Sequence, residues 1–161
     1  HGIEPWCSDG TSQGTRMVAD IRPGPASSSP GRFLRVGARV AFCTATWNSG
    51  PCPYEGDELW LSDGTTTSRL AQRQGLRWSF TALGDRLFVH EDDAVTCIWT
   101  GRPTPLVEQI LGANALGSVV AIEDRALVCE STVNGPRLLV TDGTAAGTAV
   151  FSELALPLGD A

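Results

Sequence analysis

The chain has 161 residues, of which 42% are hydrophobic and 19% are charged, a composition typical of a folded globular protein and not of a disordered one. Its formal net charge is −6, and all 12 basic residues are scattered arginines, so no basic stripe is present for a nucleic-acid backbone. No apolar run reaches the roughly 18 residues that a membrane-spanning helix needs, so no membrane span is expected.

Residues 1–21 contain the first copy of the motif that organises the chain, an apolar run followed by Asp-Gly-Thr. Asp9 and Gly10 form its turn. Asp-Gly between an apolar and a β-branched run predicts a tight β-hairpin, because glycine accepts a positive φ and the aspartate side chain can bond to its own turn. Residues 1–21 are therefore interpreted as half a repeat. Residues 22–32, rich in Pro, Gly and Ser, are expected to form a surface connection.

Three complete repeats follow, at residues 33–75, 77–108 and 117–152, with a tail at 153–161. Each begins with two short apolar runs around a turn, the pattern of a second kind of hairpin, and an arginine stands two places after the turn position. The Asp-Gly turn returns in the first and third repeats and is missing from the middle one, after Trp99. The arginines are Arg39, Arg86 and Arg125, and the later turns are Asp63-Gly64 and Asp142-Gly143.

Equivalent positions recur along these repeats at a spacing near forty residues, with 39 positions from Trp60 to Trp99 and 40 from Trp99 to Leu139. Trp6, Trp60 and Trp99 are expected to be equivalent, buried spacers between sheets. A unit of about forty residues with four strands is typical of a propeller blade. The prediction is an all-β, single-domain chain over residues 1–161, with about three and a half propeller-like blades that form an incomplete or chain-completed propeller.

Five cysteines occur without a Cys-x-x-Cys pair, which argues against a structural zinc site. Cys43 and Cys52 flank a loop rich in Pro, Gly and Asn, and a disulfide across this loop is predicted. Such a bond would place the protein in an oxidising compartment. The pairing of the remaining cysteines is left open, and these are Cys7, Cys97 and Cys129.

The motif resembles that of bacterial repeat proteins marked by His-Gly-x-Glu-Leu-Trp-x-Ser/Thr-Asp-Gly-Thr-x-x-Gly-Thr. The matching stretches are residues 1–15, 20–24, 58–65 and 141–148, and the resemblance extends over nearly the whole chain. It implies secreted or surface-attached propeller-like repeats, generally parts of longer proteins, and it brings no catalytic residues to transfer. Pro5 in place of Leu and residues 66–69 in place of Gly-Thr depart from the pattern.

A loop insertion and an acidic cluster are the candidate ligand-binding residues. Trp47 and Tyr54 lie in the insertion, which the other repeats lack, so the repeat itself does not require them. Glu91, Asp92 and Asp93 form the densest acidic cluster. Two carboxylates can serve as acid and base in glycoside hydrolysis, but a solvated hairpin tip also explains this cluster.

The two histidines allow one metal hypothesis, a copper site made by the amino terminus, His1 and His90. Against it, His1 occupies a position that the repeat fills with histidine, and His90 takes the place of Cys43 and Cys129 in the sister copies. No cofactor, metal or catalytic residue is therefore predicted. The turn aspartates offer too few oxygens for calcium, so a turn-building role is expected for them.

The favoured function is that of a non-catalytic, secreted, periplasmic or cell-surface repeat segment that acts as an interaction or scaffolding module. Open strand edges would need covering, so the expected partners are further repeats of a longer chain, other protein chains or a second copy. A carbohydrate-binding or carbohydrate-processing propeller, with a glycan ligand, is the alternative. Copper chemistry at His1 is the second alternative.

Overall fold

The structure is a computed structural model that describes residues 1–44, 58–72, 78–91, 94–102, 105–111 and 115–153. These residues form fourteen strands and their connections, with no helix among them, so the all-β prediction is confirmed. A search of the same residues for a long apolar helix that could cross a membrane finds none. The chain divides into two compact units, residues 1–77 and residues 78–161.

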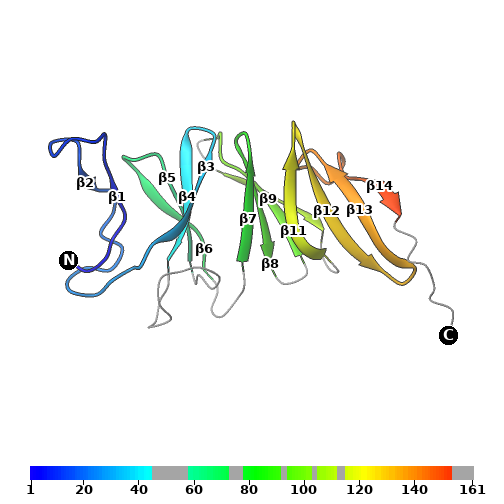
Figure 1. Ribbon diagram of the computed structural model, residues 1–161, viewed down its shortest axis with the longest axis horizontal. Helices are drawn as coiled ribbons and strands as arrows, with labels where there is room; N and C mark the ends of the chain where they lie inside the picture. Colours follow the sequence, from blue (N-terminus) through cyan, green and yellow to red (C-terminus); the bar gives the residue numbers. More distant parts are fainter. Residues whose placement is uncertain (45–57, 73–77, 92–93, 103–104, 112–114, 154–161) are drawn as a thin grey trace. The chain divides into compact units, whose positions relative to one another are not determined.

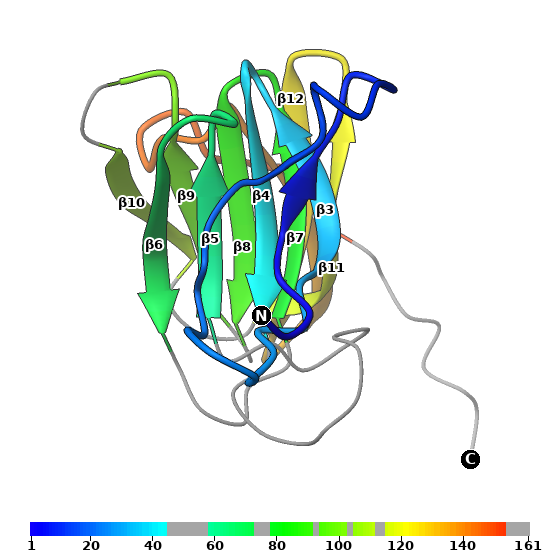
Figure 2. The same cartoon turned by 90° about the vertical axis from the view of Figure 1, so that its left-hand side faces the viewer.

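The first unit contains a two-stranded and a four-stranded antiparallel sheet. Strands β1 (Trp6–Cys7) and β2 (Arg16–Met17) form the small one, called the half-sheet below. The larger sheet runs in chain order, as Figure 2 shows from β6 across to β3. Its strands are β3 (Gly31–Val36), β4 (Arg39–Thr44), β5 (Glu58–Ser62) and β6 (Thr67–Gln72).

The second unit contains two four-stranded antiparallel sheets, each again a meander in chain order (Figure 1). The first consists of β7 (Trp78–Leu83), β8 (Arg86–Glu91), β9 (Ala94–Trp99) and β10 (Leu106–Leu111). The second consists of β11 (Ala115–Ile122), β12 (Arg125–Thr132), β13 (Gly135–Thr141) and β14 (Ala149–Glu153).

The first two strands of every large sheet are joined by a two-residue turn. The arginine that follows the turn pairs with the last residue of the preceding strand, as in Val36 opposite Arg39. The first turn residue has a φ of 59° at Gly37, 59° at Gly84 and 54° at Glu123. This dihedral belongs to a turn whose twist matches that of the strands, and glycine adopts it without a steric cost.

Apolar side chains between the two sheets form the core of the second unit. Phe88, Val95 and Cys97 are fully buried, and Val128 and Leu139 from the following sheet belong to the same cluster. The sheets also meet in a hydrogen bond, in which the Thr81 hydroxyl on β7 donates to the carbonyl of Val119 on β11, 2.8 Å away. Burial of a side chain such as Phe88 contributes roughly 2 to 3 kcal/mol.

The strand register corrects the predicted equivalence of the tryptophans. Trp60 lies opposite Phe42, three residues after the arginine of its sheet, whereas Trp99 lies opposite Arg86 itself. Trp99 therefore occupies the place that the motif aspartates hold in the other sheets. Trp6 is not a buried spacer either, since 57% of its surface is exposed.

The predicted surface connection after the half-sheet also differs from expectation. Ser28 within it is fully buried. Its amide and that of Ser29 donate to the carbonyl of Ile3, at 3.0 and 3.2 Å. The Pro, Gly and Ser content correctly excluded a helix, but it did not reveal that part of the segment packs inside the unit.

Candidate functional site

The Asp-Gly-Thr motifs form the loops that join β1 to β2, β5 to β6 and β13 to β14, called motif loops below. Their ranges are residues 8–15, 63–66 and 142–148. In the first loop, Asp9 Oδ1 accepts hydrogen bonds from the amide and the hydroxyl of Thr11, at 2.9 and 2.8 Å. The Thr11 hydroxyl oxygen accepts the Gly14 amide at 2.9 Å, and Thr15 donates back to the Thr11 carbonyl at 2.6 Å.

The last motif loop has the same bonds. Asp142 Oδ1 accepts from the Thr144 amide and hydroxyl at 2.9 and 2.8 Å. The Gly147 amide donates to the Thr144 hydroxyl oxygen at 2.8 Å, and Thr148 donates to the Thr144 carbonyl at 2.7 Å. The motif is therefore longer than a tight turn, because it specifies a loop that its own side chains hold together.

The second glycine of the motif has a steric cause. A Cβ atom at Gly14 would lie 2.0 Å from Asp9 Oδ1, and one at Gly147 would lie 2.1 Å from Asp142 Oδ1. Neither residue has a positive φ. Lack of space beside the carboxylate, and not backbone conformation, therefore requires glycine in Asp-Gly-Thr-x-x-Gly-Thr.

The shortened loop after β5 keeps part of the network. Asp63 Oδ1 accepts the amides of Thr65 and Thr66 at 2.8 and 2.6 Å. Thr67 donates to the Ser62 hydroxyl at 2.9 Å, where the hydroxyls of Thr141 and Thr148 are hydrogen-bonded to each other in the full loop. The departure from Gly-Thr at residues 66–69 thus shortens the loop without removing the role of the aspartate.

These contacts lower the pKa of all three aspartates. The largest cause is the Thr11 amide for Asp9, the Thr66 amide for Asp63 and the Thr144 hydroxyl for Asp142. Hydrogen bonds to a carboxylate favour its charged form. The aspartates are therefore anions whose oxygens are used within their own loops.

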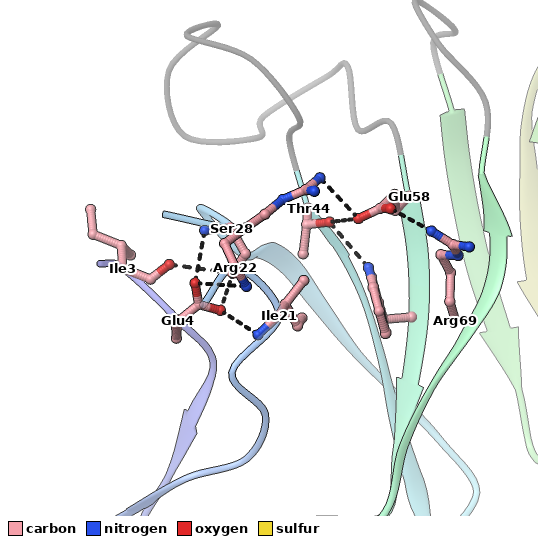
Figure 3. Close-up of polar contacts among 9 residues, drawn as sticks. Ile3, Glu4, Ile21, Arg22, Ser28, Thr44, Glu58 and Arg69 are labelled. Atoms are coloured by element: carbon pink, nitrogen blue, oxygen red, sulfur yellow. Dashed lines mark hydrogen bonds and ion pairs between the residues drawn. The ribbon is translucent and has the colours of Figure 1, made fainter. Parts of the chain in front are cut away.

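Among the described residues, two further glutamates are buried, and both belong to the first unit (Figure 3). Glu4 is only 4% exposed. Its carboxylate accepts the Ile21, Arg22 and Ser28 amides at 3.0, 3.3 and 3.1 Å and the Ser28 hydroxyl at 2.7 Å. The donors fix the connection against the half-sheet, and a charge that is buried with this many hydrogen bonds is a structural feature.

Glu58 stands at the same place in its own repeat and is 3% exposed. It forms ion pairs with Arg69 at 2.8 Å and with Arg22 at 3.4 Å, and it accepts the Thr44 hydroxyl at 3.0 Å (Figure 3). The indole of Trp60 donates to the same hydroxyl at 3.1 Å. The Glu-x-Trp pattern shared by residues 4–6 and 58–60 is the sequence signal that could have identified both glutamates.

An apolar pocket of about 280 Å³ lies in the first unit, between the half-sheet and the sheet that follows it. Carbon atoms dominate its walls, and it holds the half-buried free thiol of Cys7. Two residues that line it, Trp6 and Phe33, are exposed. Its lining residues are Pro5, Trp6, Cys7, Val18, Phe33, Val40, Phe42, Ser62 and Gly64. No sequence pattern marked this pocket.

The predicted ligand-binding residues are only partly described. Trp47, Tyr54, Asp92 and Asp93 lie outside the described residues. Glu91 ends β8 and pairs with Ala94 at the start of β9. A binding site at these residues remains a prediction.

The histidines belong to different units. His1 Nδ1 lies 3.0 Å from Asp20 Oδ2. His90 lies on β8 opposite Val95, and its Nε2 is buried without a hydrogen-bond partner. Across the described residues, no group of three or more His, Cys, Asp or Glu side chains could hold a metal ion. The copper site remains a hypothesis.

Cysteine pairing is described in part. The free thiols among the described residues are Cys7, Cys97 and Cys129. Burial raises the pKa of the Cys97 thiol to about 12, so this thiol is not reactive near neutral pH. Cys43 is not among the free thiols, whereas Cys52 lies outside the described residues, so the bond between them remains a prediction.

Comparison with known proteins adds no assignment, since the chain matches no protein-family model, no curated protein and no solved structure.

Proposed function

We propose that this chain is a blade-stacked, propeller-like segment of a secreted or cell-surface repeat protein, and that it acts by binding other protein segments. The observation that carries the proposal is the contact between consecutive sheets of the second unit. Arg86 of one sheet donates to the carbonyls of Asp142 and Asp124 in the next. The Glu108 carboxylate accepts the Ala145 amide at 2.7 Å. Such contacts extend a stack sheet by sheet.

The use of the motif carboxylates supports a non-catalytic role. Asp9, Asp63 and Asp142 bond their own loops, and Glu4 and Glu58 hold neighbouring segments. A general acid or base needs a carboxyl group directed at a substrate. These five carboxylates instead stabilise the scaffold, which leaves the surfaces of the sheets and loops for binding.

Intact mass spectrometry and light scattering of the protein from its natural source test the proposal. We expect further repeats in the same chain, or a stable complex with another protein chain. A monomer of residues 1–161 that is retained on a glycan array would contradict the proposal and favour the carbohydrate-binding alternative. Loss of that retention in Trp47→Ala would assign the glycan to the loop insertion.

A further inference from the structure

The half-sheet packs against the sheet β3–β6 in the same way as strands β9 and β10 pack against the sheet β11–β14. On β10, Glu108 pairs with Cys97 and reaches the motif loop of the following sheet at Ala145. On β2, Arg16 pairs with Cys7 and approaches Gly64 in the motif loop of the following sheet. Its Nη2 lies 4.0 Å from the point where a Cβ atom on Gly64 would be. Strands β1 and β2 are thus equivalent to β9 and β10, and Cys7 is equivalent to Cys97.

In the second unit, the inner strand β8 fills the space beside this loop. A Cβ atom at Gly143 would lie 2.9 Å from Cys97 Sγ, 3.1 Å from Arg86 Cδ and 3.5 Å from Phe88 Cζ. Phe88 and Cys97 are both 0% exposed. Arg86 and Phe88, at the start of β8, therefore fill the space between the two sheets. Their pattern is called Arg-x-Phe below.

In the first unit, the equivalent space is the apolar pocket. A Cβ atom at Gly64 would have only the tip of Arg16 within 4 Å, at 4.0 Å. Cys7 and Gly64 line the pocket as Cys97 and Gly143 line the filled space. The groups that fill the space around Gly143, the stem of Arg86 and the ring of Phe88, have no equivalent among the residues that line the pocket.

Exposure of the wall residues agrees with this assignment. Phe33 is equivalent to Val119, counted back from the turn of each sheet, but Phe33 is 55% exposed and Val119 is 5% exposed. Val40 is 37% exposed, whereas its equivalent Ala126 is 0% exposed. In the second unit these positions are covered by the preceding sheet, whose Thr81 bonds to Val119.

The backbone of β1 has an open edge, the one that faces away from β2. Its only strand partner among the described residues is β2, whereas β5, β9 and β13 each have two. Val18 donates to Pro5 at 2.8 Å, so residues 5 and 18 form a hydrogen-bonded pair. Trp6 is in the next pair and directs its amide and carbonyl away from β2.

Asp9 also differs from the other motif aspartates in its charged surroundings. Arg39 contributes to the lowered pKa of Asp63, and Arg125 contributes to that of Asp142. For Asp9 only the loop hydrogen bonds lower the pKa. If a strand paired with β1 as β12 pairs with β13, an arginine at its start would stand opposite Asp9, as Arg125 stands opposite Asp142.

We propose that β1 and the apolar pocket bind a repeat-type β-hairpin from outside residues 1–161, whose second strand begins Arg-x-Phe, pairs with β1 and inserts its phenylalanine beside Cys7 and Gly64. The inference rests on the proposed function and names its binding segment. The described chain has three hairpins of this kind, β3–β4, β7–β8 and β11–β12, and each is already paired with a third strand, namely β5, β9 and β13. A second copy therefore has no hairpin to donate without unfolding.

The test measures protection of the Cys7 thiol. The probe is a backbone-cyclised peptide of residues 78–91 closed by an Asn-Gly turn, since an isolated hairpin is marginally stable. It contains no cysteine. Alkylation of residues 1–161 by N-ethylmaleimide is followed by mass spectrometry. At a peptide concentration ten times the dissociation constant, the rate at Cys7 should fall about tenfold. The rate at the half-buried thiol of Cys129 should stay constant.

Matched variants make the test specific. The peptide with Phe88→Ala should protect Cys7 less than about twofold, because the transfer of a phenylalanine ring to an apolar site supplies roughly 1.5 to 3 kcal/mol. In the protein, Phe33→Glu should abolish protection, whereas Val107→Glu, at a position 61% exposed in the second unit, should not.

Three results would overturn the inference: no protection by millimolar peptide, equal protection by the Phe88→Ala peptide, or Cys7 protection that rises with protein concentration alone. The last would mean that a second copy covers the pocket. Failure of the peptide together with a longer natural chain or a stable protein complex would refute this site and leave the proposed function standing.

Discussion

Gly147 lies so close to Asp142 that a methyl group in place of its hydrogen would come 2.1 Å from the carboxylate oxygen Oδ1. The same relationship holds between Gly14 and Asp9, at 2.0 Å. The spacing between the aspartate and the second glycine of the motif is thus set by one packing contact. The aspartate bonds to the start of the loop, and the glycine packs against its carboxylate.

Gly147→Ala should destabilise the second unit by about 1 to 3 kcal/mol, because the loop must open to admit the methyl group. Urea unfolding measures the loss. Ala146→Ser, at the exposed neighbouring position, is the control and should change the free energy of unfolding by less than about 0.5 kcal/mol. Equal stability of the two variants would contradict the packing explanation of the motif.

The motif aspartates should make the protein sensitive to acid. Their pKa values are lower in the folded state than in the unfolded chain, so their contribution to stability is present above the ordinary carboxyl pKa near 4 and is lost as the pH falls through the folded values. Asp142→Asn should therefore give a shallower decline of unfolding free energy below about pH 4. Urea unfolding at pH values from 7 to 2.5 measures how the free energy of unfolding declines with pH. The same decline in Asp142→Asn as in the unchanged protein would count against this role.

Arg86 should be the arginine most important for the second unit. It donates to the carbonyls of Asp142 and Asp124, and its guanidinium carbon lies 5.5 Å from the centre of the Trp99 ring. Arg86→Ala should cost about 1 to 3 kcal/mol, since two carbonyls lose their donors. Arg86→Lys should recover little, because an ammonium cannot bond both in the same geometry. Arg102→Ala, at an exposed position of the same unit, is the matched control.

Glu123→Gly should stabilise the protein by up to about 1 kcal/mol, because Glu123 has a φ of 54° where the equivalent residues Gly37 and Gly84 have 59°. Thermal unfolding measures the change. The opposite kind of change at the equivalent turn residue, Gly84→Ala, should destabilise the protein by a similar amount. A loss of stability in Glu123→Gly would show that the glutamate side chain matters more than the backbone strain.

Local chemistry explains which parts of the fold the sequence predicted. The Asp-Gly turns and the two kinds of hairpin are specified by neighbouring residues, and the strands they predict are present. Trp99 was misplaced because its indole resembles that of Trp60, whereas only the strand register shows that it pairs with Arg86. Alignment by residue type cannot detect a shift of three positions along a strand.

The buried glutamates and the pocket depend on residues distant in sequence. Glu4 is buried because Ser28 and its neighbours wrap around it; the Glu-x-Trp pattern marks the glutamate, but no local pattern indicates which residues contact it. The pocket at Cys7 exists because the half-sheet has two strands where the other sheets have four. The equivalent space around Gly143 is filled by Arg86 and Phe88, which come from a strand that the half-sheet lacks.

Hydrogen exchange at the Trp6 amide tests the central claim most directly, because this group points away from β2 at the open edge of the half-sheet. We predict fast exchange in residues 1–161 alone and strong protection in the protein from its natural source, where a further repeat hairpin pairs with β1. Equally fast exchange in both would show that nothing pairs with this edge and would contradict the account.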